Sequence, residues 1–154
     1  MRVLGVNAAS GKLWLCLVED DEALETEPGW LELRAGSDAG YAMTAFRNEC
    51  VHALKALAPD RVVILDLESG GRAPRVADLR ARFTAETLLV SCAVEADVAC
   101  GRLARATVRS RLALSRRGSL ADHVTSVFGA PVGTNWKKKR DVAALAARAE
   151  IVGG

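Results

Sequence analysis

The sequence predicts an α/β fold in which a mixed five-stranded β-sheet carries helices on both faces. Three observations lead to this prediction. The first 34 residues contain three short apolar runs joined by turns, which is typical of an antiparallel meander. Segments with helical periodicity then alternate with further apolar runs. One of these runs, "RVVILDLE" at 61–68, is almost continuously apolar, as expected for a central strand buried on both faces.

The meander comprises strands predicted over residues 2–7, 13–19 and 30–34. Alternation is clearest in "WLELR", where Trp30, Glu32 and Arg34 fall on one face of the strand. The acidic segment "EDDEALETEPG" between the second and third strands is expected to be a loop.

A helix is predicted over residues 37–60, with Ser37 or Asp38 as its N-cap and Pro59 at its end. Apolar residues recur along it at helical spacing and are expected to face the core: Ala42, Phe46, Cys50 (or Ala53) and Leu57. The strand at 61–68 follows the helix.

The second half of the chain is predicted to alternate further helices with one strand. Residues 69–82 are rich in Gly, Pro and Arg and predict a loop with a helical end. A second helix is expected over 83–97 with Thr84 as its cap, followed by a fifth strand at 98–104. The remaining predicted helices are at 107–114, 120–129 and 137–151, the last with Val142, Leu145, Ala146 and Ala149 toward the core.

Length and composition are those of one soluble globular domain spanning residues 1–154. No apolar run approaches the roughly 20 residues that cross a bilayer, and the N-terminus lacks the pattern of a signal peptide. We therefore expect a cytoplasmic protein that does not bind membranes. The four cysteines show no CxxC or Cys/His cluster, so free buried thiols are favoured over metal ligands or disulfides.

Charge is distributed unevenly along the chain, although the net charge is only +2. Residues 1–60 carry 5 basic and 10 acidic side chains, whereas residues 61–154 carry 16 basic and 9 acidic ones. A basic half favours a polyanionic partner, and the alternative is a solubilising surface.

A family resemblance is carried by several segments. Gly5, Val6, Asn7 and Ser10 of "MRVLGVNAASG" match the opening of RuvC-type Holliday-junction resolvases, whose first strand ends in Gly-Ile-Asp-Pro-Gly-Ser. "PDRVVILDLE" resembles the family's fourth strand, and "ATVRSRLAL" with the following Lys-rich helix resembles the stretch after its fifth. The chain is equally similar to small uncharacterised bacterial proteins with the same opening. The resemblance implies a ribonuclease H-like fold.

The resemblance also implies a metal site. In this family, carboxylates at the ends of strands one and four and on the last helix hold two Mg²⁺ ions, which suits the preference of Mg²⁺ for charged oxygen ligands. The matching positions here, which we take as candidate catalytic residues, are Asn7, Asp66, Glu68 and Asp141. Metal ligation is expected from Asn7, Asp66 and Asp141.

Asn7 has no negative charge, and Ala144 stands where a second acid of the last helix is expected, so the resemblance predicts a degenerate site. The protein is then a weak or inactive structure-selective endonuclease, with Mg²⁺ as its cofactor or with none. Structural roles remain open for these residues: Asn7 in a turn, Asp66 and Glu68 at a strand end, and Asp141 against a helix dipole.

Basic residues are the candidates for binding duplex or branched nucleic acid through phosphate contacts. They are Arg72, Arg75, Arg109, Arg116, Arg117, Lys137, Lys138, Lys139 and Arg140. Trp136 is the aromatic residue beside a basic run. Within "SGGR", backbone N–H groups of residues 69–72 are a weaker phosphate candidate. His52 and His123 lack partners at ligand spacing and are expected to be structural.

Two other functions remain alternatives. In the first alternative, the chain is a non-catalytic interaction module, such as a homodimerisation domain, that kept the fold and lost the active site. Less favoured is a phosphate-handling enzyme of the actin-like or sugar-kinase type, because the chain is too short for their two-domain cleft.

Overall fold

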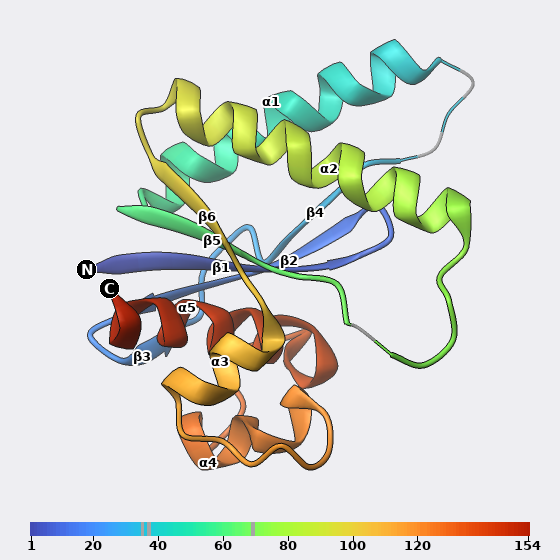
Figure 1. Cartoon of the computed structure of the whole chain (residues 1–154). Helices are drawn as coiled ribbons and strands as arrows, with labels where there is room; N and C mark the ends of the chain where they lie inside the picture. The colour runs from blue at the N-terminus through green and yellow to red at the C-terminus, as the bar shows by residue number, and fades with distance from the viewer. Residues whose placement is uncertain (35, 37, 69) are drawn as a thin grey trace.

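The computed structural model describes residues 1–34, 36, 38–68 and 70–154 and is built on one mixed sheet (Figure 1). The sheet order is β3-β2-β1-β5-β6, with β4 paired to β2 beside β3. β1 and β2 are antiparallel, whereas β5 is parallel to both β1 and β6. The predicted fold class is confirmed. The strands are β1 (Arg2–Ala9), β2 (Lys12–Glu19), β3 (Glu22–Leu24), β4 (Trp30–Glu32), β5 (Arg61–Leu65) and β6 (Ala99–Leu103).

The short strand β3 was not expected, since the acidic segment that contains it predicted a loop. It pairs with β2 at Leu17–Glu19, while β4 pairs with β2 at Lys12–Trp14. β3 and β4 therefore act as one strand interrupted at residues 25–29, which is why the sheet has six strands in five positions. Pairing with the completely buried β2 residue Val18 imposes extended backbone on a sequence with weak strand propensity of its own.

Helices cover both faces of the sheet, as predicted (Figure 1). α1 and α2 pack on one face and enclose a core that includes Leu4, Phe46 and Ile64. α5 packs on the other face over a second core that includes Val3, Val63 and Leu145. No helix among the described residues is long and apolar enough to cross a membrane. The helices are α1 (Ala39–Leu57), α2 (Val76–Glu95), α3 (Arg105–Arg111), α4 (Val124–Phe128) and α5 (Asp141–Gly153).

Local sequence accounts for the ends of α1. The Asp38 carboxylate accepts the N–H of Tyr41 at 2.9 Å and caps the N-terminus, whereas the alternative cap, Ser37, lies outside the described residues. Ala58 takes a left-handed conformation directly before Pro59 and ends the helix. Of the predicted core positions only Ala42 is half-exposed rather than buried.

α2 begins at Val76, several residues before the predicted start. The prediction that Thr84 caps this helix is wrong, because Thr84 lies in the middle of it. Within the helix, Arg82 and Glu86, four residues apart, are both buried and form an ion pair at 2.9 Å.

α5 lies unusually close to β1. A Cβ added at Gly5 would be 1.9 Å from the carbonyl oxygen of Ala143, so only glycine permits this approach. Ala143, Ala144 and Ala147 are completely buried at the contact. The helix begins at Asp141, four residues after the predicted start, because Lys137 and Lys138 in the preceding turn have non-helical dihedral angles.

Candidate functional site

The carboxyl ends of β1 and β5 meet at one edge of the sheet, since the two strands are parallel and Val6 pairs with Ile64. We call this the carboxyl edge. Asn7 lies here and is 8% exposed. Its Nδ2 donates to the carbonyl oxygen of Lys139 at 3.2 Å, which places its side chain on the α5 side of the sheet.

Asp141 is also brought to this edge, but its carboxylate is occupied by the backbone. It accepts the N–H groups of Lys138 and Lys139 at 2.9 Å each and that of Val142 at 2.7 Å. Asp141 is 2% exposed. Asn7 and Asp141 thus meet through the main chain of Lys139, and Asp141 stabilises the start of α5.

Asp66 lies on the opposite side of the sheet. Val62 and Ile64 face the core under α1 and α2, and Asp66 continues that alternation just beyond β5. Its Oδ1 is 3.9 Å from Nη1 of Arg102, which in turn donates to Glu86 on α2. The sheet therefore separates Asp66 from the side chains of Asn7 and Asp141.

Glu68 is exposed in the segment that follows β5. It lies close enough to Arg105 to influence its ionisation: burial lowers the pKa of the Arg105 guanidinium, and the negative charge of Glu68 partly opposes this. The charge of Glu68 thus acts on a basic residue at the start of α3.

These side chains, as arranged here, do not fit a two-ion metal site. Among the described residues there is no group of three His, Cys, Asp or Glu side chains able to hold a metal ion. On the α5 side, Asn7 contributes no charge, and Ala144 is a completely buried methyl group. Asp141 is the acid that remains there, and three N–H groups already satisfy it.

Most of the predicted nucleic-acid-binding residues are exposed. Arg72 and Arg75 belong to the segment that joins β5 to α2, and Lys137–Lys139 form the turn that leads into α5. Both segments border the carboxyl edge. Arg116 and Arg117 are exposed in the connection that follows α3. The loop residue Ser69, part of the weaker phosphate candidate, lies outside the described residues.

Arg140 differs from the other predicted phosphate ligands because it is 3% exposed. Its Nε donates to Leu15 at 2.9 Å and its Nη2 to Leu24 at 3.1 Å, where β3 and β4 leave a gap beside β2. Its Nη1 donates to the carbonyls of Val132 and Thr134. The guanidinium completes the sheet edge and cannot reach a phosphate in this conformation.

Arg109 is likewise engaged with the protein. It donates to the carbonyl oxygens of Ser115 at 2.5 Å and Gly118 at 2.6 Å, and it contacts His123 Nε2 at 3.2 Å. These contacts hold the connection between α3 and α4. We therefore exclude Arg109 and Arg140 from the candidate interface.

The aromatic residues near the lysines were not the ones expected. Trp136 is 7% exposed and packs edge-on against Phe128, so it does not accompany the basic turn at the surface. Instead Lys139 Nζ lies 5.1 Å from the ring centre of Trp14, and Lys12 Nζ lies 4.3 Å from that of Trp30. The sequence did contain a signal for this cluster of lysines and tryptophans, because Lys12 and Trp14 are two residues apart in one strand and therefore share a face.

Comparison with known proteins identifies the architecture. No protein-family model matches the sequence, and no curated protein sequence matches it. The Thermus thermophilus RuvC structure superposes with a TM-score of 0.74 at 16% identity, covering 99% of this chain and 94% of that one. The chain has the RuvC fold.

Two further structures with the RuvC fold are similar to this chain. T. thermophilus RuvC in complex with a Holliday junction substrate gives a TM-score of 0.73 at 16% identity, with coverage of 99% and 93%. The yeast mitochondrial Holliday junction resolvase Ydc2 gives 0.65 at 13% identity, with coverage of 98% and 78%. At identities this low, the similarity establishes the fold alone.

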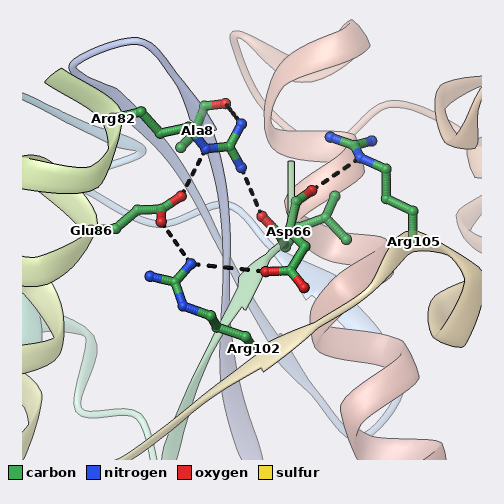
Figure 2. A network of polar contacts seen from close by, with 7 residues as sticks. Ala8, Asp66, Arg82, Glu86, Arg102 and Arg105 are labelled. Atoms are coloured by element: carbon green, nitrogen blue, oxygen red, sulfur yellow. Dashed lines mark hydrogen bonds and ion pairs between the residues drawn. The ribbon is translucent and has the colours of Figure 1, made fainter. Parts of the chain in front are cut away.

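Within this RuvC fold, a buried polar network closes the α2 side of the carboxyl edge (Figure 2). Arg82 is 6% exposed and donates to the carbonyls of Ala8 at 3.3 Å and Leu65 at 3.0 Å, joining the ends of β1 and β5. Glu86 is completely buried and accepts from Arg82 at 2.9 Å and Arg102 at 2.6 Å. The composition of "RARFTAE" gave no indication that this acid is buried.

Proposed function

We propose that this protein binds duplex or branched nucleic acid along the carboxyl edge of its RuvC-type sheet, and that its metal site is degenerate. The observation that carries the proposal is the exposed lysine turn, Lys137–Lys139, directly beside Asn7. Arg72 and Arg75 border the same edge. A row of exposed cations attracts the phosphate backbone independently of sequence.

The fold supports the same proposal by analogy, because one similar structure is T. thermophilus RuvC in complex with a Holliday junction substrate. Lysine and arginine contacts to phosphates position a nucleic acid without reading its bases. We therefore expect recognition of nucleic-acid shape rather than sequence.

The degenerate-site part of the proposal rests on charge. Two Mg²⁺ ions require several anionic oxygens in close proximity. Here Asn7 is neutral, Asp141 is satisfied by backbone N–H groups, and Asp66 is on the other side of the sheet beside Arg102. The protein is then a weak or inactive Mg²⁺-dependent endonuclease that retains binding.

Fluorescence anisotropy with a labelled duplex and a labelled four-way junction, titrated at several salt concentrations, tests the binding. Affinity is expected to fall steeply with salt. Lys137→Ala is expected to weaken it about threefold to tenfold, as for loss of one phosphate contact. Lys55→Ala removes the same charge from the last turn of α1 and is the matched control. Absence of binding at low salt overturns the proposal.

Incubation of a four-way junction with Mg²⁺ or Mn²⁺ tests the degenerate site separately. We expect binding without cleavage, or cleavage slow enough to need excess protein. Efficient, metal-dependent cutting that is abolished by Asp141→Asn would contradict the degenerate site while leaving the binding proposal intact.

A second candidate is a dimerisation module, favoured by apolar side chains on α2. Val76, Phe83 and Val94 are 72%, 49% and 67% exposed, and their spacing places them on one helical face. Light scattering after size-exclusion chromatography distinguishes a dimer from a monomer. Under this candidate, Phe83→Ser yields a monomer.

A further inference from the structure

Two lysines and two tryptophans meet where β2 pairs with β4, at the carboxyl edge. Lys12 and Trp14 share a face of β2, and Trp30 of β4 is the cross-strand partner of Trp14. Lys12 Nζ lies 4.3 Å from the ring centre of Trp30 and 5.0 Å from that of Trp14. Lys139 Nζ reaches Trp14 from the turn before α5, at 5.1 Å. We call these four side chains the lysine–tryptophan cluster.

The two indole rings are held in place by the sheet. Trp14 is 8% exposed, and its ring centre is 6.4 Å from that of Trp30 with the ring planes tilted by 58°. The N–H of Leu15 donates to the carbonyl of Gly29 at 2.8 Å and fixes the chain directly before Trp30. Trp30 is half-buried, so it remains accessible in part. A ring that is already fixed loses little conformational freedom when a ligand stacks on it.

Both ammonium groups of the cluster are available to a ligand. In the part of the chain that the structure describes, neither Lys12 nor Lys139 forms an ion pair with a carboxylate, and both lie near aromatic rings instead. Glu32, opposite Lys12 in the strand register, pairs with Arg34 at 3.7 Å. Asp141, two residues after Lys139, accepts three main-chain N–H groups. Lys12 and Lys139 can therefore each contact a phosphate oxygen without first leaving a carboxylate.

An accessible aromatic ring beside unpaired lysines is the combination with which proteins bind single-stranded nucleic acid. Bases stack on the ring, and the cations contact the phosphate backbone. In the free protein Lys12 lies over Trp30, but base stacking is the stronger contact at an exposed site, so a base is expected to replace this ammonium. A base paired inside a duplex has no free face to offer, so the ligand of such a ring is an unpaired base.

We propose that the lysine–tryptophan cluster binds an unpaired nucleobase, which stacks on Trp30 while Lys12 and Lys139 contact phosphates of the same strand. Asn7 and Trp14 are cross-strand partners, and Lys139 belongs to the exposed lysine turn, so the cluster adjoins the interface already described. The inference rests on the proposed function and narrows its ligand to nucleic acid with unpaired bases, such as a single-stranded tail of a branched molecule. Stacking accepts every base, so no sequence preference is expected.

Fluorescence anisotropy with two labelled single strands of equal length tests the stacking. One strand is oligothymidine, and the other is an abasic oligomer with the same phosphates and no bases. Wild type is expected to bind oligothymidine about fivefold to hundredfold more tightly, as for one stacked base. Equal affinity for the two strands overturns the inference, because phosphate contacts alone then account for binding.

Variants locate the preference. Trp30→Leu is expected to remove most of it while changing the affinity for the abasic oligomer by less than about twofold, because only the stacking surface is lost. Trp30→Phe keeps a ring and is expected to retain part of the preference. Lys12→Gln is expected to weaken binding of both strands and to lower the slope of log K against log salt by about 0.7. Tyr41→Leu removes an exposed aromatic side chain of α1 and is the matched control. A folded Trp30→Leu variant with the full preference would reject the stacked base.

The indole Nε1–H signals in ¹H–¹⁵N spectra test the same contact without a substitution. Saturating oligothymidine is expected to shift the signal of Trp30 and to leave that of the buried Trp136 in place. An unshifted Trp30 signal contradicts the inference.

Failure of this inference is distinguishable from failure of the proposed function. If duplex and four-way junction bind with steep salt dependence while the two single strands bind equally, the stacked base is wrong and the proposed function stands. If neither duplex nor junction binds but oligothymidine is preferred over the abasic oligomer, the proposed function fails and the stacked base stands. If none of the four ligands binds at low salt, both are wrong.

Discussion

The amide of Asn7 donates to the main-chain carbonyl of Lys139 at 3.2 Å, linking the first strand to the turn before the last helix across 132 residues of sequence. An aspartate cannot make this contact when ionised, because its oxygens only accept hydrogen bonds. The neutral side chain that removes charge from the metal position therefore also connects β1 to the lysine turn.

Asn7→Asp is expected to lower stability by about 1–3 kcal/mol without metal, since it places a carboxylate against a carbonyl oxygen and near Asp141. Mg²⁺ is expected to recover part of this loss by binding the added charge. Thermal unfolding with EDTA and with Mg²⁺ measures both effects. Asn48→Asp on the exposed side of α1 is the control, and an equal Mg²⁺ response in the two variants would contradict the prediction.

Gly5→Ala is expected to destabilise the protein by about 3 kcal/mol, because the new methyl group would collide with the Ala143 carbonyl and displace α5 from β1. Chemical denaturation measures the loss. Gly40→Ala, at the exposed start of α1, serves as control and is expected to be neutral or slightly stabilising. A stable Gly5→Ala variant would mean that α5 is not so close to the strand.

Arg140→Ala is expected to cost about 3 kcal/mol or more, because it leaves the buried carbonyl of Leu15 and the half-buried carbonyl of Leu24 without their donors. Lys137→Ala, three residues earlier and exposed, is expected to change stability by less than about 0.5 kcal/mol. The two variants are compared by urea denaturation. Weakened nucleic-acid binding by a fully stable Arg140→Ala would show that its guanidinium does reach phosphate.

Cys16 is expected to resist thiol reagents in the native protein. Burial raises the pKa of its thiol from 9.0 to about 11, so at pH 8 it stays protonated as well as inaccessible. The pKa of Cys16 is higher in the folded protein than in the unfolded chain. Its contribution to the stability of the fold is therefore fully present below about pH 9 and declines as the pH rises toward 11. Mass spectrometry after timed alkylation should label the half-exposed Cys100 first. Early labelling of Cys16 would contradict the prediction.

Periodicity in the sequence was sufficient to predict most of the sheet and the long helices. Alternation or continuous apolarity indicated β1, β2 and β5, and the spacing of Phe46, Cys50 and Leu57 indicated α1. The short strand β3 was missed because pairing with β2, rather than its own composition, makes it extended. The early start of α2 was missed because residues 69–82 are rich in Gly, Pro and Arg, a composition that predicted a loop with only its end helical.

The candidate site was less predictable, for a physical reason. Whether a charged side chain is buried depends on partners distant in sequence: Arg140 is buried against the carbonyl of Leu15, and Glu86 against Arg102. Sequence order placed Asp66 and Asn7 at adjoining strand ends. It did not determine that β5 would end at Leu65 and present Asp66 toward α2.

The interruption between β3 and β4 also affects the tendency of the protein to aggregate at high concentration. Each of these two strands offers only three residues to a neighbouring chain. In the break between them, the Arg140 guanidinium already donates to the main-chain carbonyl of Leu24. A second molecule extending the sheet here would find no long row of free amides to pair with, which protects this side from strand-by-strand aggregation.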